Sequence, residues 1–326
     1  MIPTTVLGID IAKATFHVTL LRAGQAWAGH FPNDPAGFKQ LSAWLKKRRV
    51  RAVWACLEAT GRYGEDLAEY LHDHGHTLSV VNPLVIKAYA QSQLARNKTD
   101  PLDAGLIAQY CASRRPEVWS PPAPEVRELR ELLRQYDALQ ASRQQARNRL
   151  EAGPRSPTVR AQLQAQAAFL EAQMEELQQR VREQIDAHPD LKRRQELLES
   201  IPGIGALTAA KLQAEDLERF EDARSLSAYA GVTPMNQTSG TSLRRRPKLS
   251  KMGNARLRRA LYMPAVVAAH CNPVVQALYE RLLAKGKSKM AALGAAMHKL
   301  LRLAYGVLKS GQAFDPNYSL RPQPTP

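Results

Sequence analysis

TVLGIDIAKATFHVTLL, residues 5–21, holds two short runs of β-branched and aromatic side chains separated by Ala-Lys-Ala. Such runs predict two β-strands, at 5–11 and 15–21, joined by a short link. Asp10 interrupts the otherwise apolar first strand. Because an unpaired buried carboxylate is costly, packing alone does not explain an acid at this position.

The elements predicted after these two strands follow a recognisable order. Further strands are predicted at 25–31, 51–57 and 77–81, and helices at 35–49, 63–74, 83–91 and from Pro101 onward. An antiparallel three-strand start extended by parallel strands, with helices on both faces, is typical of the ribonuclease H-like α/β fold. In such a sheet the first and fourth strands are neighbours. Asp10 and Glu58, which follows the fourth strand, are therefore expected side by side.

TDPLDAGLIAQY, residues 99–110, places two more carboxylates at the start of a predicted helix. Asp100 suits the N-cap and Pro101 the first helical position, while Asp103 lies one turn on, on the same face as Asp100. The ordinary interpretation is that both acids only favour the helix N-terminus. With the two acids of the sheet, however, they make a set of four carboxylates, which indicates a site for Mg²⁺ or Mn²⁺. Two such cations can hold a phosphodiester for in-line displacement.

Composition limits the class of partner. The chain has 326 residues, a net charge of +16 and a pI near 10.0, so a polyanionic partner is the simplest explanation. Ribosomal and chromatin proteins share this charge, so the charge indicates a class of partner but not a reaction. Three widely spaced cysteines without a CxxC pair argue against a disulfide scaffold or a structural zinc site and fit a reducing cytoplasm. Residues 1–21 carry Asp10 and Lys13 and are not expected to be a signal peptide or a membrane span.

The middle of the chain changes character after a proline-rich boundary at 116–124. Residues 125–151 and 158–187 are charged and nearly free of glycine, and the second stretch has apolar side chains at spacings of three, four or seven. This pattern predicts two long helices. They are expected to form either an intramolecular antiparallel hairpin or a coiled coil with another copy of the chain.

The C-terminal third is strongly basic. IPGIG, residues 201–205, predicts a turn between helices that is either an ordinary tight turn or resembles the phosphate-binding turn of helix-hairpin-helix motifs. Residues 223–279 contain no acid and nine Arg or Lys, while their apolar side chains indicate that they fold. Such a basic face implies phosphate contacts. The eight basic residues that cluster here are Arg244, Arg245, Arg246, Lys248, Lys251, Arg256, Arg258 and Arg259.

GVTPMNQTSGTS, residues 231–242, precedes this basic cluster and contains Ser239 in a run of small hydroxylic residues. Its ordinary interpretation is a polar turn. No His or Asp lies nearby in the sequence to act as a base, so a hydrolase-type triad is not supported.

Several separated motifs now agree with one family. GIDIAK, LEATGRYGEDLAEYL, VNP and NKTDPLDA near the N-terminus, and SIPGIG, YAGVTP and SGTSLRRRPKLSKMGNARLRRALYMPA near the C-terminus, occur in the order expected. In these blocks the chain resembles transposases of insertion-sequence family one-hundred-ten, in the eleven-eleven subgroup, whose relatives include pilin-gene invertases. The helical middle is the least distinctive part.

The resemblance implies a RuvC-like ribonuclease H-like domain whose DEDD tetrad maps onto Asp10, Glu58, Asp100 and Asp103. It also implies a C-terminal transposase domain whose serine attacks DNA, at Ser239 with Ser242 as the fallback. The resemblance further implies that the serine is supplied from another subunit, so a homo-oligomer, dimer or tetramer, is expected. It also implies that a noncoding bridge RNA chooses donor and target DNA, which would leave the protein mainly backbone contacts to make.

The expected domains are a catalytic domain at 1–118, a coiled-coil helical hairpin at 119–198, a mainly α-helical transposase domain at 199–314 and a tail at 315–326. We expect a bacterial cytoplasmic protein associated with the nucleoid. Two alternatives remain open at this point. One is a junction-resolving nuclease in which the tetrad uses water and Ser239 is a turn residue, and the other is a noncatalytic nucleic-acid-binding scaffold.

Overall fold

The computed structural model describes residues 5–59, 62–93, 100–235, 238–239, 243–244, 248–250 and 252–317, with backbone alone at 100–102, 238–239, 243–244 and 248. The chain divides into two compact units, Met1–Pro121 and Pro122–Pro326. Within the described ranges, none of the helices combines the length and the apolar character needed to cross a membrane.

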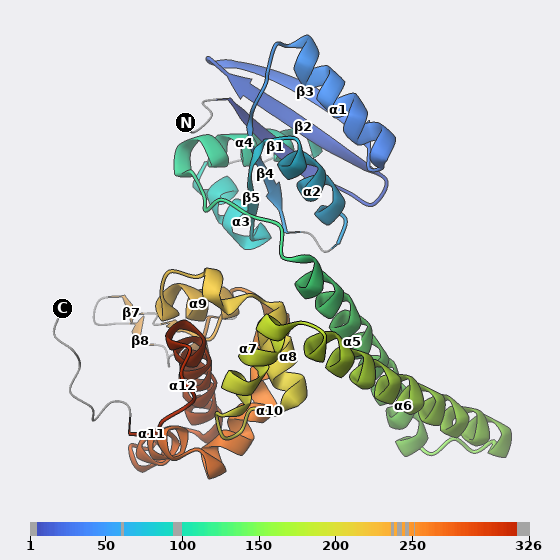
Figure 1. Cartoon of the computed structure of the whole chain (residues 1–326), viewed down its shortest axis with the longest axis vertical. Helices are drawn as coiled ribbons and strands as arrows, with labels where there is room; N and C mark the ends of the chain where they lie inside the picture. Colours follow the sequence, from blue (N-terminus) through green and yellow to red (C-terminus); the bar gives the residue numbers. More distant parts are fainter. Residues whose placement is uncertain are drawn as a thin grey trace. The chain divides into compact units, whose positions relative to one another are not determined.

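The N-terminal unit is built on a mixed five-stranded sheet with the strand order β3-β2-β1-β4-β5 (Figure 1). The pairs β1–β2 and β2–β3 are antiparallel, whereas β1–β4 and β4–β5 are parallel. The strands are β1 (Val6–Ile11), β2 (Thr15–Arg22), β3 (Gln25–Pro32), β4 (Trp54–Glu58) and β5 (Thr77–Val81). The order makes β1 the central strand, with one antiparallel and one parallel neighbour.

Helices cover both faces of this sheet. Leu7 of β1 shares one apolar core with Leu41 of α1 and Leu67 of α2. Val6, the residue before it, points to the opposite face and shares a second core with Ile107 of α4. The helices of this unit are α1 (Pro35–Lys47), α2 (Glu65–Asp73), α3 (Pro83–Ser92) and α4 (Asp100–Arg114).

Helix α4 lies directly against the central strand because Gly8 of β1 has no side chain. A Cβ at Gly8 would lie 2.1 Å from the Ala104 carbonyl oxygen and 2.3 Å from the Ala108 amide nitrogen. No larger residue fits there unless the helix moves. Asp103, the residue before Ala104, is therefore held in a helical turn that packs on β1.

The predicted order of three strands, helix, strand, helix, strand, helix and helix is confirmed, and the sheet is consistent with a ribonuclease H-like domain. Element ends differ slightly from the predictions. The fourth strand begins at Trp54 rather than Arg51, and α2 begins at Glu65 rather than Tyr63. Asp100 was predicted as an N-cap and is the first residue of α4, a difference of one residue, which is common at helix ends.

Two long helices, α5 (Pro124–Glu151) and α6 (Pro157–Asp186), begin the second unit as an antiparallel hairpin (Figure 1). At the base of the hairpin, Leu129 and Leu133 of α5 share a core with Val181 and Ile185 of α6. The apolar positions predicted from the sequence are thus buried by an intramolecular hairpin there. Association with a second copy through these helices stays a prediction.

The rest of the second unit is mainly helical, as predicted. Its largest apolar core joins α7, α8, α9, α10, α11 and α12. The helices are α7 (Pro189–Glu199), α8 (Ala206–Ala214), the 3₁₀ turn Leu217–Arg219, α9 (Ala223–Ala230), α10 (Ala255–Cys271), α11 (Pro273–Ala284) and α12 (Lys289–Ser310). Short strands join α9 to α10: β6 (Pro234–Met235) pairs with β9 (Lys248–Leu249), and β7 (Thr238–Ser239) pairs with β8 (Leu243–Arg244).

Candidate active site and nucleic-acid interface

Asp10 and Glu58 lie at the same level of neighbouring strands. Ile9 of β1 pairs with Leu57 of parallel β4, and each acid is the next residue along its strand. Both carboxylates are half-buried. The predicted neighbourhood of the two acids on the first and fourth strands is therefore present in the register of the sheet.

The two acids face helix α4. Side chains alternate along a strand, so Asp10 points to the same side as Val6, and Glu58 to the same side as Cys56. Val6 and Cys56 belong to the core that α4 completes. Asp103, half-buried in the first turn of α4, approaches this face because Gly8 lets the helix pack on β1. Asp10 and Glu58 thus share one face of the sheet, and Asp103 belongs to the helix that packs on that face.

The donor chemistry of this face suits a hard divalent cation, because carboxylate oxygens are the ligands that Mg²⁺ prefers. Among the residues with described side chains, no three of His, Cys, Asp or Glu gather closely enough to hold one metal ion. The side chain of Asp100 lies outside the described residues. The structure brings acids to one face without showing a closed coordination site.

Two histidines extend the row of acids, although neither belongs to a motif that indicates a site. His17 of β2 pairs directly with Asp10, and His30 of β3 pairs directly with His17. Directly paired residues share a face of the sheet, so His30, His17, Asp10 and Glu58 form one row across four strands. The imidazole rings of the two histidines stack with centroids 4.2 Å apart. The alternation along the second strand gives the face of His17, but only the strand register places His17 opposite Asp10.

Cys56 and Cys111 lie together in the core beneath the acids and are not disulfide-bonded. A hydrogen bond with Cys111, together with burial, raises the pKa of the Cys56 thiol well above its usual range. The thiol stays protonated and is therefore a poor metal ligand or nucleophile. Cys56 and Cys111 are therefore core residues of the N-terminal unit.

Ser239 is the second residue of β7, and it pairs with Leu243 of β8 across a short antiparallel ladder. Within the predicted loop, the backbone at 238–239 therefore belongs to a short strand. The side chain of Ser239 lies outside the described residues, as do those of Arg244 and Lys248. Four other predicted positions lie wholly outside them: Ser242, Arg245, Arg246 and Lys251.

The basic helix α10 is fixed at its start by a hydrogen-bonded side-chain network. The Asn254 carboxamide oxygen caps the helix by accepting from the amides of Arg256 and Leu257. Its Nδ2 donates to Glu215 at 2.6 Å and to the Tyr229 hydroxyl at 2.9 Å. The Tyr229 hydroxyl in turn donates to Glu215 at 3.2 Å. Burial, followed by the charge of Glu215, raises the pKa of Tyr229 and keeps this donor protonated.

Gly253 makes this network possible. Its φ is +143°, and a Cβ there would lie 2.1 Å from the Tyr229 carbonyl oxygen. That same oxygen accepts the Asn254 amide at 2.6 Å. The YAGVTP and KMGNAR motifs supply Tyr229, Gly253 and Asn254. Together with Glu215 these residues form a joint that sets the direction of α10.

Three predicted basic residues, Arg256, Arg258 and Arg259, lie on the first turns of α10. Arg256 and Arg259 are exposed. Arg256 is 3.8 Å from a carboxylate oxygen of Asp137, and Arg258 donates to the Ala230 carbonyl at 3.1 Å. These contacts orient the guanidinium groups of Arg256 and Arg258, and Arg and Lys are the residues that neutralise phosphates.

The IPGIG turn contacts α10. Gly203 has φ +100°, and a Cβ there would lie 2.7 Å from the Ala268 side chain. Asn272 donates to the Pro202 carbonyl at 3.2 Å. These contacts account for the glycine and the tight turn by packing. Phosphate binding at the exposed N-terminus of α8 stays a prediction.

Comparison with known proteins agrees with the motifs. Residues 7–153 match a family described as a transposase of the DEDD IS110 type, and residues 195–280 match the transposase IS116/IS110/IS902 family. A pilin gene-inverting protein of Moraxella bovis is 35% identical over 317 residues, 95% of this chain and 98% of the relative. Its counterpart in Moraxella lacunata is 34% identical over 316 residues, 95% and 98% of the two chains. An uncharacterized 43.6 kDa protein of insertion element IS110 from Streptomyces coelicolor is 30% identical over 152 residues, 46% of this chain and 35% of the relative.

Proposed function

The chain belongs to the IS110 family of transposases, and on this premise we propose that it recombines DNA with four carboxylates and a serine nucleophile. Transposases bind, cleave and join DNA. Two relatives are named for inverting a pilin gene, so DNA inversion is a reaction we also propose for this chain. We further assign it to the eleven-eleven subgroup.

The carboxylates Asp10, Glu58, Asp100 and Asp103 would hold Mg²⁺ or Mn²⁺, which membership of a DEDD family implies. The bound cation supplies positive charge to the scissile phosphate. What supports this assignment is the register that puts Asp10 and Glu58 side by side on the face covered by α4. The half-buried position of Asp103 in the first turn of α4 supports it as well.

Ser239 is proposed as the nucleophile, with Ser242 as the alternative. The serine oxygen forms an ester bond to the phosphorus and gives up its proton to solvent, while the bond from phosphorus to a deoxyribose oxygen breaks. That oxygen takes up a proton and leaves as a DNA hydroxyl. In the rejoining step a DNA hydroxyl attacks the phosphoserine and releases the serine.

The nucleic-acid contacts are assigned to the basic face of the second unit. Its cluster at 244–259 would neutralise phosphates of donor DNA, target DNA and a noncoding bridge RNA. Base pairing by that RNA would choose the sequences, so the protein needs backbone contacts more than a base-reading helix. We also propose that the IPGIG turn contacts a phosphate.

The proposed assembly follows from the placement of the serine and the carboxylates in different subunits. We propose a homo-oligomer, dimer or tetramer, in which the serine of one subunit acts at the carboxylates of another. The proposed domains are a RuvC-like domain at 1–118, a hairpin at 119–198, a transposase domain at 199–314 and a tail at 315–326. We expect the protein to act at the nucleoid in the bacterial cytoplasm.

The observation that carries the proposal is that Asp10 and Glu58 each follow the paired residues Ile9 and Leu57 on neighbouring strands, in a chain of this family. The test is recombination between sites in the DNA that flanks the coding region, measured for Ser239→Ala and Ser242→Ala. Loss in Ser239→Ala alone supports Ser239. Unchanged recombination in Ser239→Ala rejects that serine, and cleavage that leaves only free DNA ends would instead support a water-using nuclease.

A further inference from the structure

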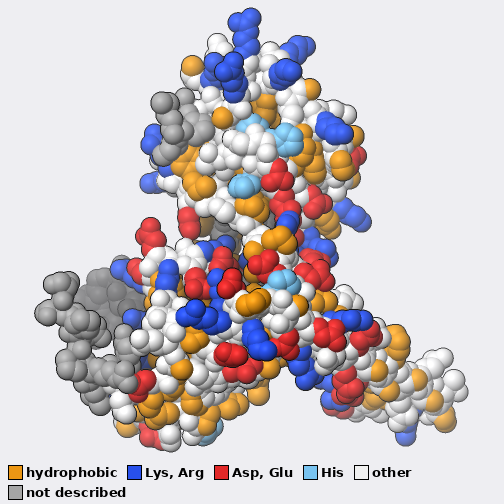
Figure 2. All heavy atoms as spheres, viewed as in Figure 1, with side chains coloured by type: hydrophobic (Ala, Val, Ile, Leu, Met, Phe, Trp, Pro, Cys, Tyr) orange, Lys and Arg blue, Asp and Glu red, His pale blue; other side chains and the backbone are white. Residues whose placement is uncertain are grey.

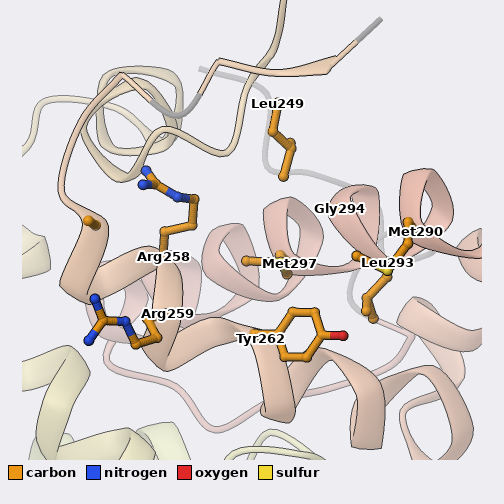
Figure 3. Close-up of a pocket in the computed structure, with 9 residues that line it drawn as sticks. Leu249, Arg258, Arg259, Tyr262, Met290, Leu293, Gly294 and Met297 are labelled. Carbon is orange, nitrogen blue, oxygen red and sulfur yellow. The ribbon is translucent and has the colours of Figure 1, made fainter. Parts of the chain in front are cut away.

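A hollow of about 330 Å³ opens between helices α10 and α12 beside strand β9 (Figure 3). Its volume is at the small end of the range for ligand pockets, so it suits one compact group rather than an extended chain. Leu293 and Met297 of α12 form part of the wall and are buried. Gly294 matters here, because a Cβ on it would come within 3.3 Å of the Leu249 side chain.

The wall of this hollow is apolar in the middle and cationic at one end. Figure 3 shows Tyr262 between the two arginines, Arg258 and Arg259, on one side and Met290 on the other. Tyr262 and Met290 are 39% and 65% exposed, which is high for side chains of this kind. The arginines are the charged residues that line the hollow.

Acids are scarce in the part of the sequence that forms this hollow. Between residues 223 and 314, Glu280 is the single acid in the chain. An apolar peptide would match only the apolar part of the wall and not the two arginines. An anion with a flat apolar body matches both parts of the wall, and a nucleotide is such a group.

We propose that this hollow receives one unpaired nucleotide, with the base against Tyr262 and Met290 and the phosphate at Arg258 and Arg259. The inference rests on the nucleic-acid-binding role proposed above and adds a preference for single strands. Aromatic rings stack on any base, and the flexible thioether of methionine adapts to bases of different size. Recognition at this site is therefore independent of base identity.

The test measures binding of the full chain to a short fluorescein-labelled oligothymidylate and to a blunt duplex of matched length, by fluorescence anisotropy. Tyr262→Ala should weaken oligothymidylate binding by roughly tenfold and leave duplex binding within about twofold. Tyr262→Phe keeps the ring and should bind as the wild type does. Met263→Ala is the matched control, since Met263 is 61% exposed on the same helix but does not line the hollow.

A second variant covers the case in which Tyr262→Ala fails to fold. Met290→Ala alters an exposed side chain at the N-terminus of α12 and should weaken oligothymidylate binding by a smaller factor. Wild-type binding by the folded Tyr262 and Met290 variants, or equal losses on single strand and duplex, would overturn the inference. A changed sedimentation coefficient with unchanged oligothymidylate binding would overturn it in favour of protein contact. If only this inference is wrong, the wild type still recombines DNA. If the proposed function is wrong, the wild type does not recombine DNA, but Tyr262→Ala still weakens oligothymidylate binding.

Discussion

The two units position their proposed functional residues by different means. In the N-terminal unit, backbone hydrogen bonds of the sheet put Asp10 beside Glu58 and opposite His17. In the second unit, side-chain hydrogen bonds from Asn254 to Glu215 and Tyr229 aim helix α10. A sheet register survives most single side-chain changes, whereas a network of this kind depends on each member.

Figure 2 shows Lys and Arg gathered at the top of the N-terminal unit, while the view of the second unit mixes acids and bases.

The largest effect is expected from Asp10→Asn, which keeps the size of the side chain and the sheet but removes the charge. Recombination should fall by more than about 100-fold, the upper end for residues that only support a metal ligand. The wild type should also gain thermal stability when Mg²⁺ is added, because the cation relieves repulsion among the carboxylates. The variant should not, because it has lost one of those carboxylates. Thermal denaturation with and without Mg²⁺ checks this.

Asp73→Asn is the control for Asp10→Asn, because Asp73 is exposed at the end of α2. It should leave both recombination and the Mg²⁺ response unchanged. Full recombination by Asp10→Asn would remove the carboxylates from the reaction and favour a noncatalytic scaffold.

The next effect tests how α4 is held on the sheet. Gly8→Ala places a methyl group 2.1 Å from the Ala104 carbonyl oxygen, so α4 must shift. We expect a loss of about 1–3 kcal/mol in the free energy of unfolding, together with lower recombination as Asp103 moves away. Urea denaturation followed by circular dichroism measures the stability.

Gly105 offers the matched control on α4 itself. A Cβ there has the Thr19 hydroxyl as its nearest described neighbour, at 3.8 Å, an ordinary contact. Gly105→Ala should be neutral or stabilise the chain by up to about 1 kcal/mol, since alanine favours a helix. Equal behaviour of the two alanine variants would show that α4 does not pack on β1 as described.

The corresponding change in the second unit is Asn254→Ala. It removes the N-cap of α10 and two hydrogen bonds to the joint, and should cost about 2 kcal/mol. Because α10 carries Arg256, Arg258 and Arg259, duplex DNA affinity should fall as well. Ser156→Ala removes the cap of α6 instead, and should lower stability without lowering that affinity. Full DNA affinity in Asn254→Ala would show that this joint does not contribute to DNA binding.

The smallest effect is a change in salt dependence. Nucleic-acid affinity of the wild type should fall steeply as salt rises, since phosphates are neutralised by Arg and Lys. Arg259→Ala should reduce the slope of log affinity against log salt by about 0.7–0.9, the value for one phosphate. Arg180→Ala, in which an arginine paired with Glu183 is lost, should leave the slope unchanged. A nearly flat salt response of the wild type would contradict the basic face.

The difference between the units also decides what could be predicted from the sequence. The order of strands and helices follows from hydrophobic patterns and is typical of a fold in which the first and fourth strands are neighbours, so the neighbourhood of Asp10 and Glu58 was predictable. The row of His17 and His30 was not predictable, because it depends on two registers. The turn in which Ala12 donates to the Thr15 carbonyl connects β1 to β2, and the turn at Ala23 and Gly24 connects β2 to β3.

In the second unit, composition predicted a basic face but could not predict its orientation. The residues that aim α10, Tyr229 and Glu215, lie far from Asn254 in sequence, and no periodic pattern links them. The hollow lined by Tyr262 and Met290 has no sequence pattern either, since it forms only where α10 and α12 pack. The hairpin of α5 and α6 shows the opposite case, because two charged stretches nearly free of glycine, the second with apolar residues at helical spacing, predicted both helices.

The most direct test of the proposed chemistry is to isolate the protein–DNA adduct after denaturation and map the modified residue by mass spectrometry. We predict a phosphoester on Ser239 in the wild type and no adduct in Asp10→Asn, since the carboxylates and the serine act in one reaction. DNA cut by the wild type with free ends and no bond to the protein would contradict this.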